Sequence, residues 1–250
     1  MVVLIKAAVI FLYGNRLYPP MGVKIVDIEG IGPVKLVKRA GSRTIRVVIT
    51  SRSEVRVTMP NIVPYAAGIA FAQSKRAWIV QHLRPVQLLT DGRKVGKQHH
   101  IQFVRTTGKK VSTRVTSEAA VIGLPNSVDP TSLAAQDAAR AVALRALHVE
   151  AKAYLLPRIK VLADQHGFVY GNVSVKHMQS RWGSCTQQRD IALNCFLMEL
   201  PLQLIDYVLV HELVHTRIMA HGKPFWDEVA KYVPRLSLIR KHMRRMKPDF

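Results

Sequence analysis

The sequence predicts an α+β fold in which a β-rich N-terminal half, residues 21–128, packs as one compact unit on a helix-rich core, residues 129–250. Three observations lead to this prediction. Branched residues alternate with cations in short stretches of the first half, as is typical of strands. A long stretch rich in Ala, Leu and Arg follows Asp129-Pro130, a pair that favours a helix start. The apolar run Leu202–Val210, which a proline opens, is long enough for a buried helix.

The first 20 residues stand apart from this pattern. Residues 2–13 are apolar around Lys6, but the stretch is too short to span a bilayer comfortably. It also lacks the basic start and the clear cleavage site of a secretory signal. We therefore expect residues 1–20 to be a loose leader or the product of a mis-set translation start. No other segment is typical of a membrane span, so we expect no membrane partner.

Five stretches of the N-terminal half are predicted strands: residues 34–38, 44–50, 55–59, 98–106 and 110–116. The cations that alternate along the first of them indicate a sheet with one basic, wet face. Between the third and fourth strands, Asn61 can cap a helix from residue 63 to about residue 83. The adjacent His99 and His100 point to opposite faces of a strand, and we expect both at the surface.

The C-terminal core is predicted to begin with one long helix. This helix follows the Asp129-Pro130 pair and runs to about His166, with a kink or break near Pro157 and an end at Gly167. Three short strands then lead into the helix of the apolar run: residues 169–176, 178–185 and 191–197.

The two cysteines, Cys185 and Cys195, lie on either side of a turn expected at residues 187–190. In a regular hairpin Cys195 lies opposite a residue near Trp182 rather than opposite Cys185. We therefore expect no disulfide, and we expect a reducing, cytoplasmic setting.

The strongest chemical signal is the run His211-Glu212-Leu213-Val214-His215 at the end of the apolar helix. Residues four apart on a helix are about 6 Å apart along the axis and at nearly the same angle. His211 and His215 can therefore bind one metal ion. Glu212 points about 100° away from His211, beside the ion, where a carboxylate can take a proton from water. Two histidines and a glutamate in a buried apolar helix would be costly without such a partner.

A third ligand is expected beyond this helix. His221 follows His215 by six residues, which on an unbroken helix places it about 9 Å further along and turned by some 240°. It can bind the same ion only if the helix ends early, and a glycine and a proline just after it mark a break. A carboxylate of the next helix, Glu228 or Asp227, is the alternative third ligand.

Three sequence blocks carry a resemblance to a known family. They are Ser-Arg-Trp-Gly-Ser-Cys at 180–185, Ile-Ala-Leu-Asn at 191–194, and the segment 206–226 that holds the histidines. In order and spacing they resemble the YgjP-like zinc metallopeptidases, relatives of the SprT-type and WLM-type zinc peptidases. The resemblance extends more loosely over the chain from about residue 21.

This resemblance implies a zincin-like metallopeptidase core that hydrolyses peptide bonds. It implies a zinc ion (Zn²⁺) on His211, His215 and His221, with Glu212 as the catalytic base. The chain departs from the family at Ala220, where members often carry Asn, a residue that helps a turn with positive φ.

Further candidate residues lie in the first two blocks. Arg181 and Asn194 are candidates for contacts with the substrate or with the oxyanion of the reaction. The strand around Ile191–Leu197 is expected to hold a protein or peptide substrate by edge pairing.

Charge is the last feature that bears on function. The chain has 37 Lys and Arg against 16 Asp and Glu, a net charge of +21. This excess suits an anionic partner, and we expect non-specific contact with nucleic acid or action on nucleic-acid-associated protein. The alternatives are a non-catalytic, zinc-stabilised nucleic-acid-binding protein and a zinc hydrolase of another acyl substrate. The sequence carries no signal for an oligomeric state.

Overall fold

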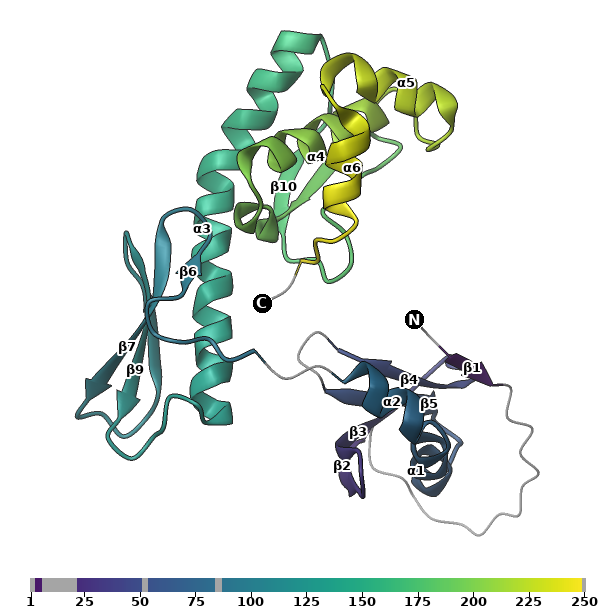
Figure 1. Ribbon diagram of the computed structural model, residues 1–250, viewed down its shortest axis with the longest axis vertical. Coiled ribbons are helices and arrows are strands. Elements are labelled where there is room, and N and C mark those ends of the chain that lie inside the picture. Colours follow the sequence, from purple (N-terminus) through teal and green to yellow (C-terminus); the bar gives the residue numbers. More distant parts are fainter. Residues whose placement is uncertain (1–2, 6–21, 51–53, 84–86, 249–250) are drawn as a thin grey trace. The chain divides into compact units, whose positions relative to one another are not determined.

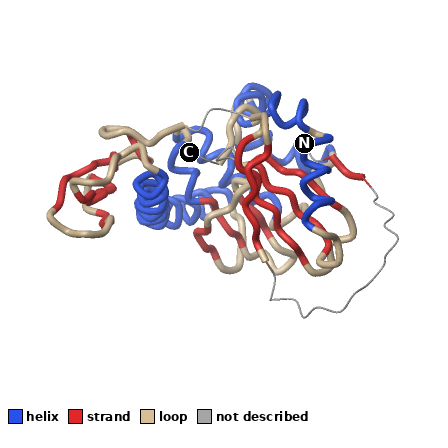
Figure 2. Tube along the Cα trace, turned by 90° about the horizontal axis from the view of Figure 1, so that it is seen from below, coloured by secondary structure: helices blue, strands red, loops and turns tan. Residues whose placement is uncertain are grey.

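The computed structural model describes residues 3–5, 22–50, 54–83 and 87–248. The chain divides into two compact units, Met1–Gln87 and Leu88–Phe250, called unit 1 and unit 2 below (Figure 1). Both units combine helices and strands (Figure 2), which confirms the predicted α+β class. The predicted division is corrected, because the boundary falls after residue 87 rather than after residue 128.

Unit 1 is a five-stranded sheet with two helices. The strands lie in the order β1-β4-β5-β3-β2, with β3 and β5 parallel and the other neighbours antiparallel. Their bounds are β1 Val3–Ile5, β2 Val23–Ile28, β3 Gly32–Arg39, β4 Ile45–Ile49 and β5 Val55–Pro60. The helices are α1 Tyr65–Ser74 and α2 Arg76–His82, which replace the single helix expected over residues 63–83.

Burial alternates along the strands of unit 1. Val34 and Leu36 of β3 are fully buried in a core that includes residues of α1 and α2, whereas Lys35 between them is partly exposed. On β4, Arg46 likewise lies between the buried Ile45 and Val47, and on β5 Arg56 lies between the buried Val55 and Val57. The alternation confirms the basic, wet sheet face that the sequence predicts.

The start of the chain contributes one short strand to unit 1. Of residues 1–20, residues 3–5 form β1, which pairs with β4, and residues 6–20 lie outside the described part of the chain. Among the described helices, none is both long enough and apolar enough to cross a membrane.

Unit 2 begins with a four-stranded sheet that packs on one long helix. The strands lie in the order β6-β7-β9-β8, and every residue of β9 is buried. Their bounds are β6 Lys94–Val95, β7 His99–Thr106, β8 Ser112–Val115 and β9 Ala119–Pro125. The helix is α3, Leu133–His166. Because residues of this sheet and of α3 share one hydrophobic core, residues 88–128 belong with unit 2.

The long helix differs from its prediction at the start. Its N-cap is Ser132, whose side chain accepts a hydrogen bond from the Ala135 amide, so α3 begins later than the sequence suggests. Pro157 lies inside α3 without ending it. The predicted end is confirmed, because Gly167 adopts the left-handed conformation, with φ of 66°, at the C-cap.

His99 is buried rather than at the surface. Its Nδ1 lies 2.6 Å from Glu150 Oε1, and its Nε2 lies 3.0 Å from the carbonyl oxygen of Thr116. The Glu150 carboxylate also accepts hydrogen bonds from the backbone amides of Lys97, Gln98 and His99. This pair joins the start of β7 to α3.

The rest of unit 2 carries the motifs that the sequence singles out. A three-stranded sheet lies in the order β10-β12-β11, so β12 is its central strand. The elements are β10 Val173–Lys176, β11 Gly183–Cys185, β12 Ile191–Asn194, the short 3₁₀ helix η1 Cys195–Glu199, α4 Leu202–His215, α5 Lys223–Tyr232 and α6 Leu236–Met243. Both cysteines are free, which confirms that they form no disulfide.

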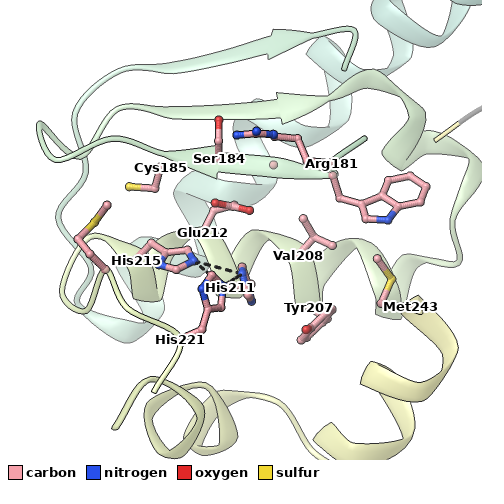
Figure 3. A pocket seen from close by; sticks show the side chains of 13 residues that line it. Arg181, Ser184, Cys185, Tyr207, Val208, His211, Glu212, His215, His221 and Met243 are labelled. Carbon is pink, nitrogen blue, oxygen red and sulfur yellow. Dashed lines mark hydrogen bonds between the residues drawn. The ribbon is translucent and has the colours of Figure 1, made fainter. Parts of the chain in front are cut away.

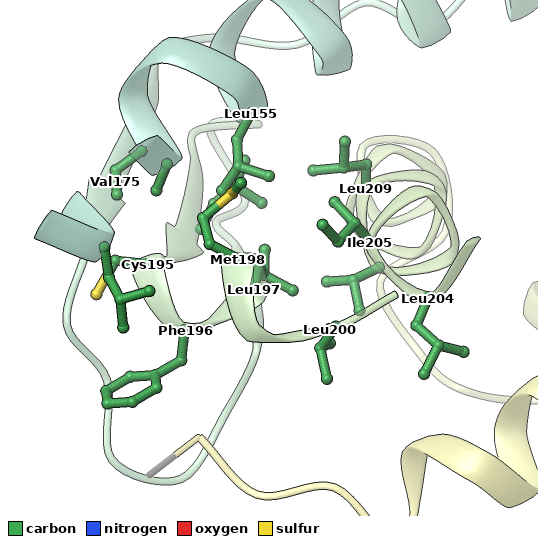
Figure 4. Packing of buried hydrophobic residues seen from close by; sticks show 14 of the residues in the cluster. Leu155, Val175, Cys195, Phe196, Leu197, Met198, Leu200, Leu204, Ile205 and Leu209 are labelled. Carbon is green, nitrogen blue, oxygen red and sulfur yellow. The ribbon is translucent and has the colours of Figure 1, made fainter. Parts of the chain in front are cut away.

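The core of unit 2 packs α4 against η1 and α3. Apolar side chains of η1, of α4 and of α3 interdigitate between these elements (Figure 4). Leu155, Leu197, Ile205 and Leu209 are fully buried there. This packing buries Ile205 and Leu209 in the core, and the last turns of α4 place Glu212 against Gly183 of β11.

Candidate metal centre and active site

The end of α4 presents three polar side chains from an apolar helix. His211, Glu212 and His215 lie in its last turn and a half, and Glu212 and His215 are only 4% and 7% exposed. The helix ends at His215, with Thr216 as its C-cap. The early end that a third histidine ligand requires is therefore present.

A turn after α4 brings His221 back to the two helical histidines. The Thr216 hydroxyl donates a hydrogen bond to the carbonyl oxygen of Leu213, and the Arg217 amide donates to the carbonyl oxygen of Val214 instead of Leu213 as the helix ends. His215 Nδ1 donates to the carbonyl oxygen of Ile218 at 3.1 Å, so the turn and the metal-facing ring hold each other. Trp226 Nε1 donates to the carbonyl oxygen of His221 and fixes the end of the turn.

Arg217 anchors this turn to two distant elements. Its guanidinium donates to Glu228 Oε1 and the Tyr232 hydroxyl on α5, and to the carbonyl oxygens of His166 and Gly167 at the end of α3. The same guanidinium lies 4.0 Å from the centroid of the Phe168 ring. The loop between the second and third histidines is thus held from outside, which explains how it turns without a glycine, proline or asparagine.

The three histidines converge on one point (Figure 3). Their Nε2 atoms are 3.2 Å apart between His211 and His215, 3.1 Å between His215 and His221, and 3.1 Å between His211 and His221. Three nitrogens bound at about 2.0–2.1 Å to one tetrahedral ion lie about 3.3 Å apart. The spacing of the three nitrogens therefore fits a single metal ion.

The protonation of the imidazoles also fits a metal. Burial lowers the pKa of His211 to about 3, and the charges of the neighbouring histidines act in the same direction. Burial lowers the pKa of His215 as well. Since the Nδ1 proton of His215 is directed to Ile218, its Nε2 atom carries a free lone pair toward the other rings.

Phe225 of α5 supports the cluster from below. Its side chain is fully buried, and its ring centroid lies 4.9, 4.5 and 4.8 Å from the rings of His211, His215 and His221. Phe225 thus gives the three imidazoles an apolar floor that limits their movement.

Glu212 lies between α4 and β11. Its Oε2 atom is buried and has no hydrogen-bond partner among the described residues. Burial raises the pKa of its carboxyl to about 8, and the Arg181 charge opposes this shift. A carboxyl left without a protein partner at the side of a metal site is free to bond to a water or a substrate atom.

The histidines and Glu212 open into one pocket of about 510 Å³ (Figure 3). Its walls come from the loop before β11, from β11, from α4, from the turn between α4 and α5, and from α6. The lining residues are Arg181, Trp182, Gly183, Ser184, Cys185, Tyr207, Val208, His211, Glu212, His215, Met219, His221 and Met243.

The two candidates for substrate contact differ in their placement. Arg181 lines the pocket and is exposed. Asn194 is fully buried and does not line it. The Asn194 side-chain nitrogen donates to the carbonyl oxygens of Met178 and Arg181, and its oxygen accepts from the Phe196 amide. Asn194 is therefore corrected from a substrate contact to a residue that holds the loop before β11.

The predicted substrate strand is also corrected. Because β12 pairs with β10 on one side and with β11 on the other, it has no open edge. Among the described strands β11 pairs only with β12, which leaves one edge of β11 open, and Gly183, Ser184 and Cys185 of this strand line the pocket.

The alternative carboxylate ligands lie elsewhere. Glu228 pairs with Arg217 at 3.0 Å and with Lys231 at 2.6 Å, and Asp227 pairs with Lys223. Among the described residues, the group of His, Cys, Asp and Glu side chains that could hold an ion consists of His211, His215 and His221.

Comparison with known proteins identifies the family of the chain. A family model described as "YgjP-like, metallopeptidase domain" matches residues 43–246. The chain therefore belongs to the YgjP-like metallopeptidase family, as the three sequence blocks predict. Family membership identifies it as a peptidase, and the three-histidine cluster provides a place for a metal cofactor.

Two solved metallopeptidase zymogens are similar to part of the chain. Abylysin of Pyrococcus abyssi is 23% identical, over 34% of this chain and 87% of its own, with a TM-score of 0.31. Jannalysin of Methanocaldococcus jannaschii is 21% identical, over 35% of this chain and 90% of its own, with a TM-score of 0.32. No curated protein matches the chain.

Proposed function

We propose that the chain is a zinc-dependent peptidase in which Glu212 activates a water molecule. The observation that carries this proposal is the convergence of three Nε2 atoms, 3.1–3.2 Å apart, at the pocket that Glu212 also lines. Neutral imidazole nitrogens in this arrangement are usual ligands of catalytic zinc.

The ligand number favours catalysis over a purely structural metal. Structural zinc sites are usually closed by four protein ligands. In the described part of the chain no fourth His, Cys, Asp or Glu atom joins the three nitrogens. One position is thus left for water or substrate, which disfavours the alternative of a non-catalytic, zinc-stabilised protein.

The residues of the site have distinct roles in this proposal. Zinc, when bound by His211, His215 and His221, acidifies water and polarises a carbonyl group. Glu212 accepts the proton of the attacking water and passes it to the leaving amine. The Glu212 carboxylate, whose Oε2 atom has no hydrogen-bond partner among the described residues, is the group that holds this proton between the two transfers.

The substrate is a protein or peptide that lies along β11. An extended chain added to the outer edge of β11 exchanges backbone hydrogen bonds with Gly183–Cys185 and crosses the pocket. Arg181, exposed beside this strand, is placed to stabilise the oxyanion or to orient a substrate carboxylate.

Elemental analysis of freshly purified, never-chelated protein tests the metal. We expect about one zinc per chain, and we expect His215→Ala to lose it while keeping the circular dichroism spectrum of the wild type. Protein that is folded but holds no transition metal would contradict the proposal.

We also propose that the basic face of the unit 1 sheet contacts nucleic acid without sequence preference. Lys35 and Arg56 are direct neighbours across β3 and β5, and Arg46 lies on the next strand of the same face. Like charges placed side by side destabilise a sheet, and an anionic backbone relieves that repulsion. Contacts of this kind weaken steeply with salt.

A salt titration with duplex DNA and with RNA tests this contact. We expect the double change Lys35→Glu and Arg56→Glu to weaken binding at low salt and to reduce its salt dependence. The same change at the exposed Lys223 and Lys231 of unit 2 is the charge-matched control. Absence of binding to either nucleic acid at low salt would refute the contact.

A further inference from the structure

Apolar side chains of α4 and α6 gather on one side of the histidines in the pocket. Tyr207 and Val208 precede His211 by four and three residues, so they lie one turn along α4 on the face of the metal ligand. They are 8% and 4% exposed. Figure 3 shows both residues on the same side of the histidines as Met243.

Two other segments complete this end of the pocket. Met243, the last residue of α6, and Trp182, from the loop before β11, both line it and are partly buried against the core of unit 2. Both are therefore held in place rather than projecting into solvent. The end of the pocket beside Tyr207 and Val208 thus has walls from three separate parts of the chain.

The wall that α6 provides is fixed relative to the turn between α4 and α5 that carries His221. Ile239 buries α6 in the core. Arg240 places its guanidinium 3.5 Å from the centroid of the Trp226 ring, and Trp226 donates a hydrogen bond to the His221 carbonyl oxygen. Met243 therefore keeps a set position with respect to the ligand His221, one turn of helix beyond Arg240.

We propose that Trp182, Tyr207, Val208 and Met243 form a subsite for an apolar side chain of the substrate, at a position that flanks the cleaved bond. This inference rests on the proposed peptidase function. Val208 is branched and stiff and sets the depth of the subsite. Met243 is flexible and adapts to side chains of different shape, so Leu, Met and Phe all fit.

The opposite end of the pocket provides a contrast. Cys185 lies on the other side of the histidines from Met243 (Figure 3), and Met219, from the turn between His215 and His221, lines the pocket and is 47% exposed. An open wall of this kind removes little apolar surface from water and discriminates weakly between side chains. Specificity should therefore depend on the Val208 end and not on the Met219 end.

Cleavage profiling tests the subsite with the full-length, metal-loaded protein and a mixture of peptides analysed by mass spectrometry. We expect Leu, Met or Phe at one position next to the cleaved bond to be favoured over Asp, Lys or Gly by about 10–200-fold in kcat/KM. Val208→Phe should shift the preference at that position toward Ala and Val. Met243→Ala should shift it toward the largest aromatic side chains.

Met219→Ala is the matched control, since it truncates the same residue type at the other end of the pocket. It should leave the preference at that position unchanged. If Val208→Phe does not fold, Met243→Ala alone tests the subsite. Met243 is the last residue of the half-exposed helix α6, so its truncation should leave the fold intact. Two results would overturn the subsite. One is cleavage with no preference for Leu, Met or Phe next to the cleaved bond, and the other is an equal change of that preference in Met243→Ala and Met219→Ala.

A binding measurement distinguishes failure of the subsite from failure of the peptidase function. If the metal-loaded wild type cleaves no peptide, the function is refuted, and the subsite is then measured by calorimetry with a pair of peptide hydroxamates that differ only in Gly or Leu. The subsite predicts about tenfold or tighter binding of the Leu compound, lost or reduced in Met243→Ala. Equal affinity for the two compounds would overturn the subsite.

Discussion

Gly183 of β11 packs directly against the side chain of Glu212 on α4. A Cβ atom added to Gly183 would lie 2.5 Å from Glu212 Oε1 and 2.7 Å from its Cγ and Cδ atoms. Real Cβ atoms do not approach other atoms so closely, so Glu212 occupies the space that any other residue at 183 would fill. The glycine of the first sequence block therefore positions the carboxyl group that we propose as the catalytic base.

Gly183→Ala should displace the Glu212 carboxyl and leave the histidines in place. We expect peptide hydrolysis to fall by about 100-fold, the cost of misplacing a catalytic group by about 1 Å, with metal content unchanged. Ser184→Ala, at the neighbouring pocket residue, is the control and should cost little. A Gly183→Ala protein with wild-type turnover would show that the Glu212 position does not matter.

Arg217→Ala should weaken metal binding although Arg217 touches no ligand atom. The substitution removes four hydrogen bonds and the contact with Phe168, so the turn that carries His221 loses its anchor on α3 and α5. We expect about a 10–100-fold loss of affinity, the usual effect of residues that orient ligands. Competition with a chelator measures it.

Two variants separate this positioning role from general destabilisation. Arg217→Lys keeps the charge but not the fork of donors, so it should restore little of the metal affinity. Lys231→Ala removes the other cationic partner of Glu228 and should leave metal affinity near wild type. If Arg217→Ala binds metal as tightly as the wild type, the anchor has no functional role.

His221 and Glu228 make opposite predictions as the third ligand. His221→Ala should reduce zinc affinity severely, because His221 Nε2 lies 3.1 Å from the Nε2 atoms of both other histidines. Glu228→Gln keeps an acceptor for Arg217 and should cost far less. Chelator competition on the two variants checks the order, and the reverse order would show that a carboxylate of α5 binds the metal.

The stability of the metal-free protein should fall between about pH 6.5 and 8. The folded-state pKa of Glu212 is raised above its ordinary 4.5 to about 8, because burial favours the neutral carboxyl. A group with a raised pKa contributes stability that is complete below its unfolded pKa and is lost as the pH rises through its folded pKa. The loss over this window amounts to about 1–2 kcal/mol, at about 1.4 kcal/mol per pH unit.

Urea unfolding of chelated protein across this range measures the effect. Below about pH 6.5 the lowered pKa of His211 acts in the opposite direction, since stability from a neutral buried imidazole is lost as the pH falls. Glu212→Gln carries no titrating group and should remove the decrease above that pH. An identical pH dependence in the two proteins would exclude Glu212 as its origin.

Local geometry makes the histidine cluster predictable from sequence. The spacing of His211 and His215 places both on one helix face whatever the rest of the fold, and the three sequence blocks are enough to indicate the family. The alternating burial of β3 follows in the same way from Val34, Lys35 and Leu36. These features depend on neighbours within a few residues of one another.

Features that depend on distant partners are not predictable in this way. The end of α4 is anchored through Arg217 to carbonyl groups about 50 residues earlier, and His99 is buried by Glu150, 51 residues away. The parallel pairing of β10 with β12 closes the strand edge that the sequence suggests for substrate. The sequence misleads about Asn194 for a related reason, since its partners come from the loop that β12 packs against.

Zinc and Glu212 act together in the peptide hydrolysis that we propose, and one assay measures the contribution of each. Zinc-loaded wild type and zinc-loaded Glu212→Gln are compared, at equal metal content, on an unfolded protein substrate followed by mass spectrometry. We predict cleavage by the wild type that a chelator abolishes and zinc restores, and a rate about 10²–10⁴-fold lower in Glu212→Gln. Equal rates in the two proteins, or cleavage by the wild type that persists without metal, would contradict the account.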